Sequence, residues 1–425
     1  MSTSAQLETS AKADVVRPTN GLIAAGSTPL HRLDGDLWVE IVDPRAQPSE
    51  LAKKWDDLST NASDPNAFFD RWFLAPAMAS FAAGKDVILA CVHRGSSRKD
   101  VAPAMVGLFP LERTPARFGR ARTLKLFWNQ YTFLQTPLIR QGHEIETWEA
   151  FLKWADERSG CDLVDLPLVR GEGTVGKSLV EVVHRRKPAT LISSVHTRAL
   201  MRRCGSEEEF LSAALTSKQR HQYERQARRL AELGTVEYRR MSGSDWATPW
   251  IEGFIALESR GWKGDARTAL ADDNVACEFV RTVLLEAANR GRLRAIGIWL
   301  NGQPIALKLN LLASPGSFAF KIAYDEAYSK FSPGVLLELE NIRHFHDGTD
   351  AAWMDSCAAP DHPMINRLWR DRVLLQHVLL STGTRKGDLA VGLRPLGRAL
   401  RRVFGRGKKP AKQDAPRKDA ESQPS

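Results

Sequence analysis

The chain has 425 residues, of which 43% are hydrophobic and 26% are charged. This composition is typical of a globular protein of two or three domains and excludes a wholly disordered, collagenous or coiled-coil chain. The formal net charge is +10, and residues 394–425, with ten Lys or Arg against three Asp or Glu, carry +7 of it. Because a nucleic-acid-binding core is normally basic itself, we expect no nucleic acid among the partners.

The five cysteines are scattered along the chain and form no Cys-x-x-Cys pair. This pattern argues against a disulfide framework and against a zinc site, so we predict no metal site and a reducing compartment. We find no secretory signal, and polar side chains interrupt the most apolar stretch, residues 293–312. We therefore expect a cytoplasmic protein without a membrane span.

The first half of the chain alternates between strand and helix patterns. Residues 1–35 have no periodicity, and we predict that they are disordered. After them, the spacing of apolar residues predicts strands at 37–42, 87–93, 104–111, 123–127 and 162–169, and helices at 49–58, after Asp64-Pro65, and at 144–158.

A similar series begins near Val195. Ser206 and Glu209 indicate a capping box, and the helical pattern continues from there through Leu233. Asn301-Gly302 is a strong hairpin signal between two apolar strands. The remaining predicted elements are helices at 249–259 and 275–289, strands at 293–300, 304–312, 317–324 and 351–355, a helix after 332–334 and a final helix at 364–380.

One predicted helix begins where a phosphate could bind. The sequence Ser332-Pro333-Gly334 follows directly on a predicted central strand and starts a helix. The N-terminus of a helix offers free backbone N–H groups and the positive end of its dipole. The turn is therefore a candidate phosphate site.

Six short segments spread over residues 36–380 form an ordered set. They are 66–69 with Trp72, 107–111, the basic stretch from Ser217, Glu258 with 262–264, the hairpin 301–306, and 323–328 followed by 332–334. Their order resembles that of the GNAT acyltransferase superfamily. More narrowly, it is similar to the two-domain group named after cellulose-biosynthesis acetyltransferases, a relative of the Fem-type aminoacyltransferases.

The resemblance implies a mixed α/β fold of two tandem GNAT-like domains, at 36–192 and 193–382, followed by a tail at 383–425. It implies transfer of an acyl group from acyl-CoA or a related thioester to an amine or hydroxyl of an envelope lipid, polysaccharide or metabolite. Acyl-CoA would be a co-substrate held by the second domain, with no permanently bound cofactor. The usual GNAT phosphate loop, Gln/Arg-x-x-Gly-x-Gly/Ala, is absent, and only residues 330–334 stand in its place.

The donor-binding residues that we predict lie in two segments. The turn before the helix contributes Lys330, Ser332, Gly334 and Val335, and the basic stretch contributes Lys218 and Arg220. A solvated helix face is the alternative interpretation of that stretch.

The acceptor must lose a proton when it attacks a thioester, so a proton acceptor is needed. Asp325, Glu258 and His362 are the candidates, and for Asp325 the alternative is to cap the turn that follows it. The residues that we predict to bind the acceptor are Trp262, Lys263, Tyr324 and Tyr328.

Two other functions fit parts of the sequence. A non-catalytic GNAT-like protein could bind an envelope lipid or polysaccharide during assembly. A P-loop nucleotidase is the more remote alternative, because residues 171–178 match Gly-x-x-x-x-Gly-Lys-Ser after a predicted strand. An antiparallel hairpin follows, however, instead of the alternating strands and helices of a P-loop domain.

The tail combines apolar and basic residues. Apolar side chains recur at helical spacing from Leu393 to Phe404 among four arginines, Arg406 follows, and Pro395 falls in the predicted first turn. A basic helix with one apolar stripe is typical of an interfacial membrane anchor. We predict that residues 393–409 bind an anionic membrane surface; a solvated tail or a helix docked on its own domain is the alternative.

Overall fold

The computed structural model describes residues 31–32, 36–45, 49–95, 103–116, 121–260 and 270–404, and the side chains of its last helix as far as Pro395. Of residues 1–35, which the sequence predicts to be disordered, only 31–32 lie within these ranges. Among the described residues, no helix is long and apolar enough to cross a membrane.

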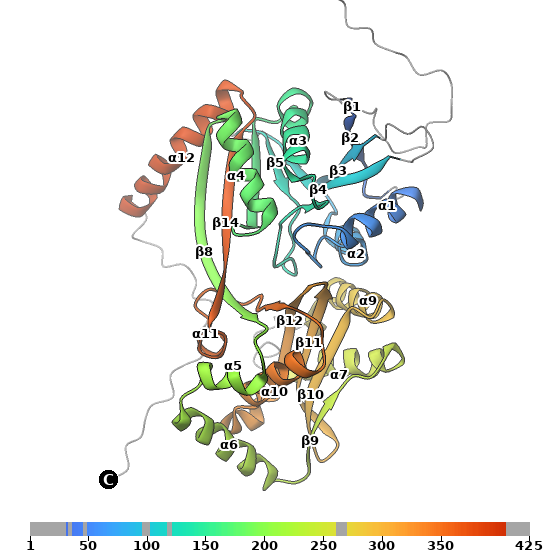
Figure 1. Cartoon of the computed structure of the whole chain (residues 1–425), viewed down its shortest axis with the longest axis vertical. Helices are drawn as coiled ribbons and strands as arrows, with labels where there is room; N and C mark the ends of the chain where they lie inside the picture. The colour runs from blue at the N-terminus through green and yellow to red at the C-terminus, as the bar shows by residue number, and fades with distance from the viewer. Residues whose placement is uncertain are drawn as a thin grey trace, which may run out of the picture.

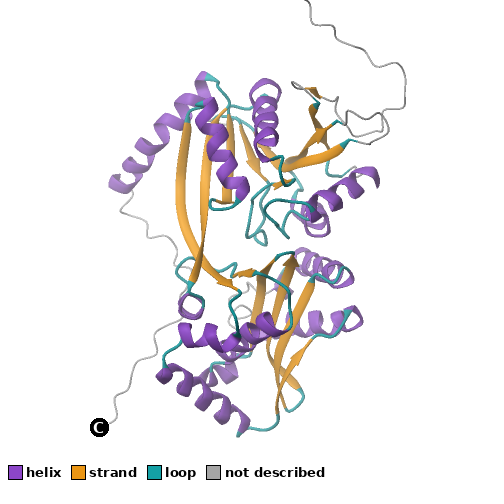
Figure 2. Cartoon of the chain, in the orientation of Figure 1, coloured by secondary structure: helices purple, strands orange, loops and turns teal. Residues whose placement is uncertain are grey.

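One mixed sheet runs through the described chain, with helices on its faces (Figures 1 and 2). Its strands follow the order β1 (His31–Arg32), β2 (Leu37–Val42), β3 (Asp86–Arg94), β4 (Ala104–Thr114), β5 (Thr123–Leu126), β7 (Leu163–Arg170), β14 (Asp371–Ser381), β8 (Thr190–Arg202), β13 (Trp353–Asp355), β12 (Gly316–Tyr324), β11 (Gln303–Ala313), β10 (Leu293–Leu300) and β9 (Val236–Arg240), and β6 (Leu138–Ile139) pairs with β4.

Apart from the additional two-residue strand β6 in the first half, the chain uses one order of elements twice: a strand, two helices, three strands, a helix, a strand, a helix and a last strand. The first series runs from β2 to β8 and includes α1 (Ser49–Thr60), α2 (Arg71–Phe81), α3 (Glu144–Arg158) and α4 (Thr174–Arg186). The second runs from β9 to β14 and includes α7 (Ala247–Arg260), α9 (Asn274–Asn289), α10 (Pro333–Asp347) and α11 (Pro363–Leu368). Helices α5 (Glu207–Ala214) and α6 (Ser217–Ala231) connect the two.

The two series exchange their last strands. Strand β14, which ends the second series, pairs with β7 of the first, and β8, which ends the first series, pairs with β13 of the second. The long strands β8 and β14 also pair with each other from Asp371 to Leu380 and connect the two halves of the molecule (Figure 1). The predicted boundary at residue 192 falls inside β8.

The two halves share one hydrophobic core. Phe68 and Phe73, from the first half, form edge-to-face contacts with Phe318 and Phe320 of β12, with ring centroids 5.1 and 5.9 Å apart. A separate cluster of buried residues lies on the other face of the second half, beneath α10. Because buried aromatic rings contribute a large apolar area, these contacts hold the halves together.

The structure corrects two predicted helices. Residues 364–380 form only the short helix α11 and then strand β14, because Val373, Leu375 and Val378 to Leu380 are buried between β7 and β8. The continuous helix predicted from Ser206 is divided into α5 and α6. Thr216 starts α6 with a capping box of its own, formed with Gln219.

Candidate functional site

The parallel strands β12 and β13 separate after a short pairing. Only Gly316, Ser317 and Phe318 of β12 have partners in β13, the last of which is Asp355. At the same level, Phe320 forms a β-bulge, since β12 uses two residues where β11 uses one. Bulges redirect strands and end pairing, often beside active sites. We call this place the β12–β13 fork.

The free edge of β12 presents backbone hydrogen-bonding groups beyond the fork. The N–H of Asp325 donates to the carbonyl oxygen of Ile305 in β11, at 2.9 Å. Because the bonds of an antiparallel ladder alternate, the N–H and C=O groups of Ile322 and Tyr324 point away from β11. They therefore face the fork and can pair with an extended ligand.

Helix α10 begins next to this edge, after a short 3₁₀ turn at Glu326–Phe331. Ser332 adopts a left-handed conformation (φ +53°), and its hydroxyl accepts a hydrogen bond from Gln226 of α6 at 3.0 Å. A Cβ added to Gly334 would lie 3.4 Å from the Tyr324 ring and 3.9 Å from the sulfur of Met364 in α11. The end of β12 and the starts of α10 and α11 therefore meet at Gly334.

The equivalent fork of the first half is filled by the chain itself. Strands β5 and β7 also separate after three paired residues. The buried side chain of Gln135 donates to the carbonyl oxygens of Leu126 and Phe127, and its N–H donates to Leu168 of β7 at 3.0 Å. These bonds occupy the backbone groups that β5 and β7 would offer to a ligand.

Helix α6 places cations beside the turn before α10. Lys218, Arg225 and Arg229 are exposed and share one side of the helix, next to the side from which Gln226 reaches Ser332. Lys330 is exposed in the turn itself. Arg220 is directed elsewhere, since it forms an ion pair with Glu208 at 2.8 Å and lines a separate small groove.

Two of the three predicted proton acceptors lie at this end of the sheet. The Asp325 carboxylate accepts the N–H of Ala327 at 2.9 Å and so caps the 3₁₀ turn, in which the N–H of Tyr328 donates to the Asp325 carbonyl. His362 caps α11 through Nδ1, which accepts the N–H of Ile365, so the hydrogen of the neutral ring is on Nε2. Burial lowers the pKa of His362, so the ring is neutral at neutral pH.

Glu258, the third candidate, lies on the opposite face of the sheet. Its buried carboxylate is 3.7 Å from the Lys321 ammonium of β12 and accepts the N–H of Leu270. Lys321 also lies over the ring of Tyr131, 5.0 Å from its centroid, and burial raises the pKa of that tyrosine to about 12. The pattern of the sequence did not indicate Lys321 or Tyr131. Trp262 and Lys263 lie outside the described residues.

A buried polar network lies behind the fork, between β11 and α10. The Lys308 ammonium contacts the Glu338 carboxylate at 2.7 Å, and both side chains are almost fully buried. The other Glu338 oxygen accepts hydrogen bonds from the indole N–H of Trp369 and the amide of Asn341. The network fixes α10 on the sheet at the level of the fork.

The loop that matches the P-loop pattern is a helix start whose donors are already used. The Asp64 carboxylate accepts the N–H groups of Thr174 and Val175, at 3.3 and 2.8 Å. The Ser178 hydroxyl donates to the Val175 carbonyl. A carboxylate thus occupies the place where a P-loop holds phosphate, which argues against a nucleotidase.

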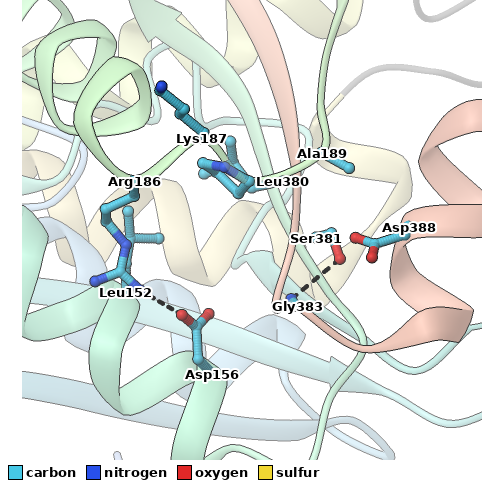
Figure 3. Close-up of a pocket in the computed structure, with 10 residues that line it drawn as sticks. Leu152, Asp156, Arg186, Lys187, Ala189, Leu380, Ser381, Gly383 and Asp388 are labelled. Atoms are coloured by element: carbon cyan, nitrogen blue, oxygen red, sulfur yellow. Dashed lines mark hydrogen bonds and ion pairs between the residues drawn. The ribbon is translucent and has the colours of Figure 1, made fainter.

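A groove of about 620 Å³ lies far from the fork, between α3, the end of α4 and the start of α12 (Arg385–Phe404) (Figure 3). Arg186 and Lys187 line it together with Asp156 and Asp388, and Arg186 forms an ion pair with Asp156. Its two cations are balanced by two carboxylates, so it lacks the excess positive charge of a phosphate site.

Comparisons with known proteins show what this arrangement is similar to. Residues 217–362 match the model of the acetyltransferase (GNAT) domain. A comparison with curated proteins found no match. Among solved structures, FemX is similar with a TM-score of 0.51 and 9% identity, over 83% of this chain and 98% of FemX.

Two further solved structures have lower scores. A Bacteroides thetaiotaomicron protein of unknown function has a TM-score of 0.49 and 8% identity, over 77% of this chain and 97% of its own. A tandem GNAT protein from the clavulanic acid biosynthesis pathway has a TM-score of 0.43 and 12% identity, over 82% and 99%. Residues 217–362 are therefore similar to a GNAT acetyltransferase domain, and the overall fold is similar to that of FemX.

Proposed function

We propose that the protein is an acyltransferase that binds acyl-CoA, or a related thioester, at the β12–β13 fork. The observation that carries the proposal is the free edge of β12 beside the start of α10. The pantetheine arm of CoA contains two amides, which can pair with the backbone groups of Ile322 and Tyr324. The pyrophosphate then reaches the N-terminus of α10 and the cations Lys218, Arg229 and Lys330.

The reaction needs an activated acyl carbonyl, which the bound thioester supplies. The N–H groups on the edge of β12 are donors for the carbonyl oxygen as charge develops on it. Asp325 is the proton acceptor that we propose at this end of the sheet, because the neutral His362 ring carries its hydrogen on Nε2 when Nδ1 accepts from Ile365. Glu258, which is paired with Lys321, lies on the face of the sheet where we propose that the acceptor binds.

The acceptor that we propose is an amine or hydroxyl of an envelope lipid or saccharide. FemX is one of the solved structures with a similar overall fold, and the order of short motifs resembles that of the cellulose-biosynthesis acetyltransferases. A non-catalytic GNAT-like protein that binds such a molecule is the second candidate. The two differ in turnover, because only the enzyme releases free CoA from acetyl-CoA when an acceptor is present.

Substitution of Gly334 tests the donor site. We expect the Gly334→Glu variant to bind CoA about a hundredfold more weakly, because the new carboxylate repels the pyrophosphate at a cost of about 3 kcal/mol. Isothermal titration calorimetry with CoA measures the effect. Because Gly334 is buried, circular dichroism of the variant is the check that its fold persists.

Gly334→Ala is the matched control. Its Cβ makes only ordinary contacts with Tyr324 and Met364, so CoA affinity should stay within about threefold of the parent chain. Equal CoA binding by the Gly334→Glu variant, or no binding by the parent chain, would contradict the donor assignment.

We also propose peripheral binding to an anionic membrane through α12 and the residues after it. The helix begins at Arg385, so Pro395 lies in its interior and not in its first turn. Val391 is buried against Leu163 and Leu379, which docks the start of α12 on the first half of the protein. Leu389 and Leu393, four residues apart, remain 61% and 49% exposed.

Introduction of negative charge at the exposed leucines tests this membrane contact. We expect Leu389→Glu with Leu393→Glu to lower co-sedimentation with phosphatidylglycerol vesicles by about tenfold or more, since burial of each leucine contributes about 2 kcal/mol. Leu233→Glu, at a leucine 46% exposed in the second half, is the matched control and should bind like the parent chain. Unchanged sedimentation of the double variant would remove α12 as the anchor.

A further inference from the structure

A groove lined by three tryptophans lies on the face of the second half that carries α7. Its volume is about 560 Å³, and Trp246, Trp250 and Trp299 line it together with Arg239 and Pro304. Trp246 is 59% exposed, although a large apolar ring is normally covered. A concave site of this size, with a few polar groups at its rim, is typical of a small-ligand site.

The rings are held in fixed orientations. Trp250 and Trp299 meet edge to face, with centroids 4.8 Å apart and planes at 76°, so they form a corner. Gly297 makes room for this arrangement, because a Cβ there would lie 2.5 Å from the Trp299 ring. The corner is therefore preformed.

The rim of the groove is polar but nearly balanced in charge. The Arg239 guanidinium lies 5.0 Å from the centroid of Trp299. Its Nε and Nη2 atoms both contact one carboxylate oxygen of Glu237, at 3.0 and 2.9 Å. The neighbouring Arg240 is paired with Glu340. The rim thus offers fixed donors and acceptors to a ligand rich in hydroxyl groups, without excess charge that would favour a polyanion.

The groove lies on the acceptor side of the proposed site. Trp299 pairs with Pro304 beside the turn at which β11 begins, and the free end of β12 lies at this same end of the sheet. Helix α7 connects the groove with Glu258: Trp250 and Glu258 are separated by about 12 Å of helix. A chain-like acceptor that occupies the groove can therefore extend along α7 toward the pair formed by Glu258 and Lys321.

We propose that this groove binds a pyranose unit of an oligosaccharide, as an outlying subsite for the acceptor; this assignment rests on the proposed function. The C–H groups on the face of a pyranose carry small positive charges and pack against the electron-rich face of an indole. The second indole bounds the edge of the sugar, and the paired Arg239 and Glu237 bind its hydroxyl groups. A membrane surface is the competing ligand for exposed tryptophans, but a concave corner with a carboxylate at its rim does not suit insertion into lipid.

The test is calorimetric titration of the full chain with hexasaccharides of glucose, N-acetylglucosamine and mannose, and sedimentation with phosphatidylcholine vesicles. We expect at least one hexasaccharide to bind, and Trp246→Ala and Trp250→Leu each to weaken that binding about tenfold or more. Trp128→Ala, at a tryptophan 46% exposed in the first half, is the matched control and should leave the affinity unchanged.

Binding of none of the three saccharides, or equal binding by the groove variants, would overturn the proposal, as would vesicle binding that depends on Trp246. CoA titrations of the same samples separate this outcome from the proposed function. If CoA binds and the saccharides do not, only the groove assignment fails; if the saccharides bind and CoA does not, only the donor assignment fails.

Discussion

Replacement of Glu338 by glutamine should lower the free energy of unfolding by about 3–5 kcal/mol. The change leaves the Lys308 ammonium buried without its counter-charge, because the two side chains are 0% and 3% exposed and 2.7 Å apart. Glutamine is of similar size, and its carbonyl oxygen can still accept from Trp369 and Asn341. Urea unfolding followed by circular dichroism measures the loss.

A second substitution separates the effect of charge from that of packing. Addition of Lys308→Met to the Glu338→Gln chain removes the unpaired ammonium and keeps an apolar stem in its place. Most of the lost stability should return. A double variant as unstable as the single one would show that an unpaired charge is not the cause.

Replacement of Arg198 by methionine should cost a similar amount, about 3–5 kcal/mol. The Arg198 guanidinium, 4% exposed, binds the buried Asp355 carboxylate at 2.8 Å and donates to the Phe133 carbonyl of the first half at 2.6 Å. The change leaves Asp355 buried and unpaired at the end of β13. CoA affinity should fall as well, because Asp355 also accepts the N–H of Cys357 in the loop beyond the fork.

The matched control for Arg198 lies four residues along the same strand. Arg202 is exposed, so Arg202→Met should change the free energy of unfolding by less than about 0.5 kcal/mol. Thermal unfolding of the three chains in one buffer gives the comparison. Equal loss in both variants would mean that removal of any arginine from β8 is harmful and that the contact with Asp355 is not special.

Local sequence patterns predicted most of the second half of the sheet. Asn301-Gly302 marked the β10–β11 turn, and the alternation of apolar residues marked the strands on either side of it. Pro333 and Gly334 marked the start of α10, which lies where the phosphate turn was expected. These features depend on neighbouring residues, so the sequence contains enough information to predict them.

Features that depend on distant residues were missed. Val373, Leu375 and the run Val378–Leu380 fit a helix as well as a strand, and only pairing with β7 and β8 makes them a strand. Tyr131, Glu258 and Lys321 meet across the two halves, and no local pattern connects them. Gln135, which fills the first fork, resembles an ordinary loop residue in the sequence.

The exchange of last strands constrains how the chain can fold during synthesis. Leu163 of β7 pairs with Ser381 of β14, so the edge of the first half stays uncovered until β14 has left the ribosome. Pairings between such distant residues slow folding, and a bare edge of apolar strands favours aggregation meanwhile. The two halves therefore cannot mature one after the other, and a gene fragment that encodes either half alone would yield a sheet with a missing strand.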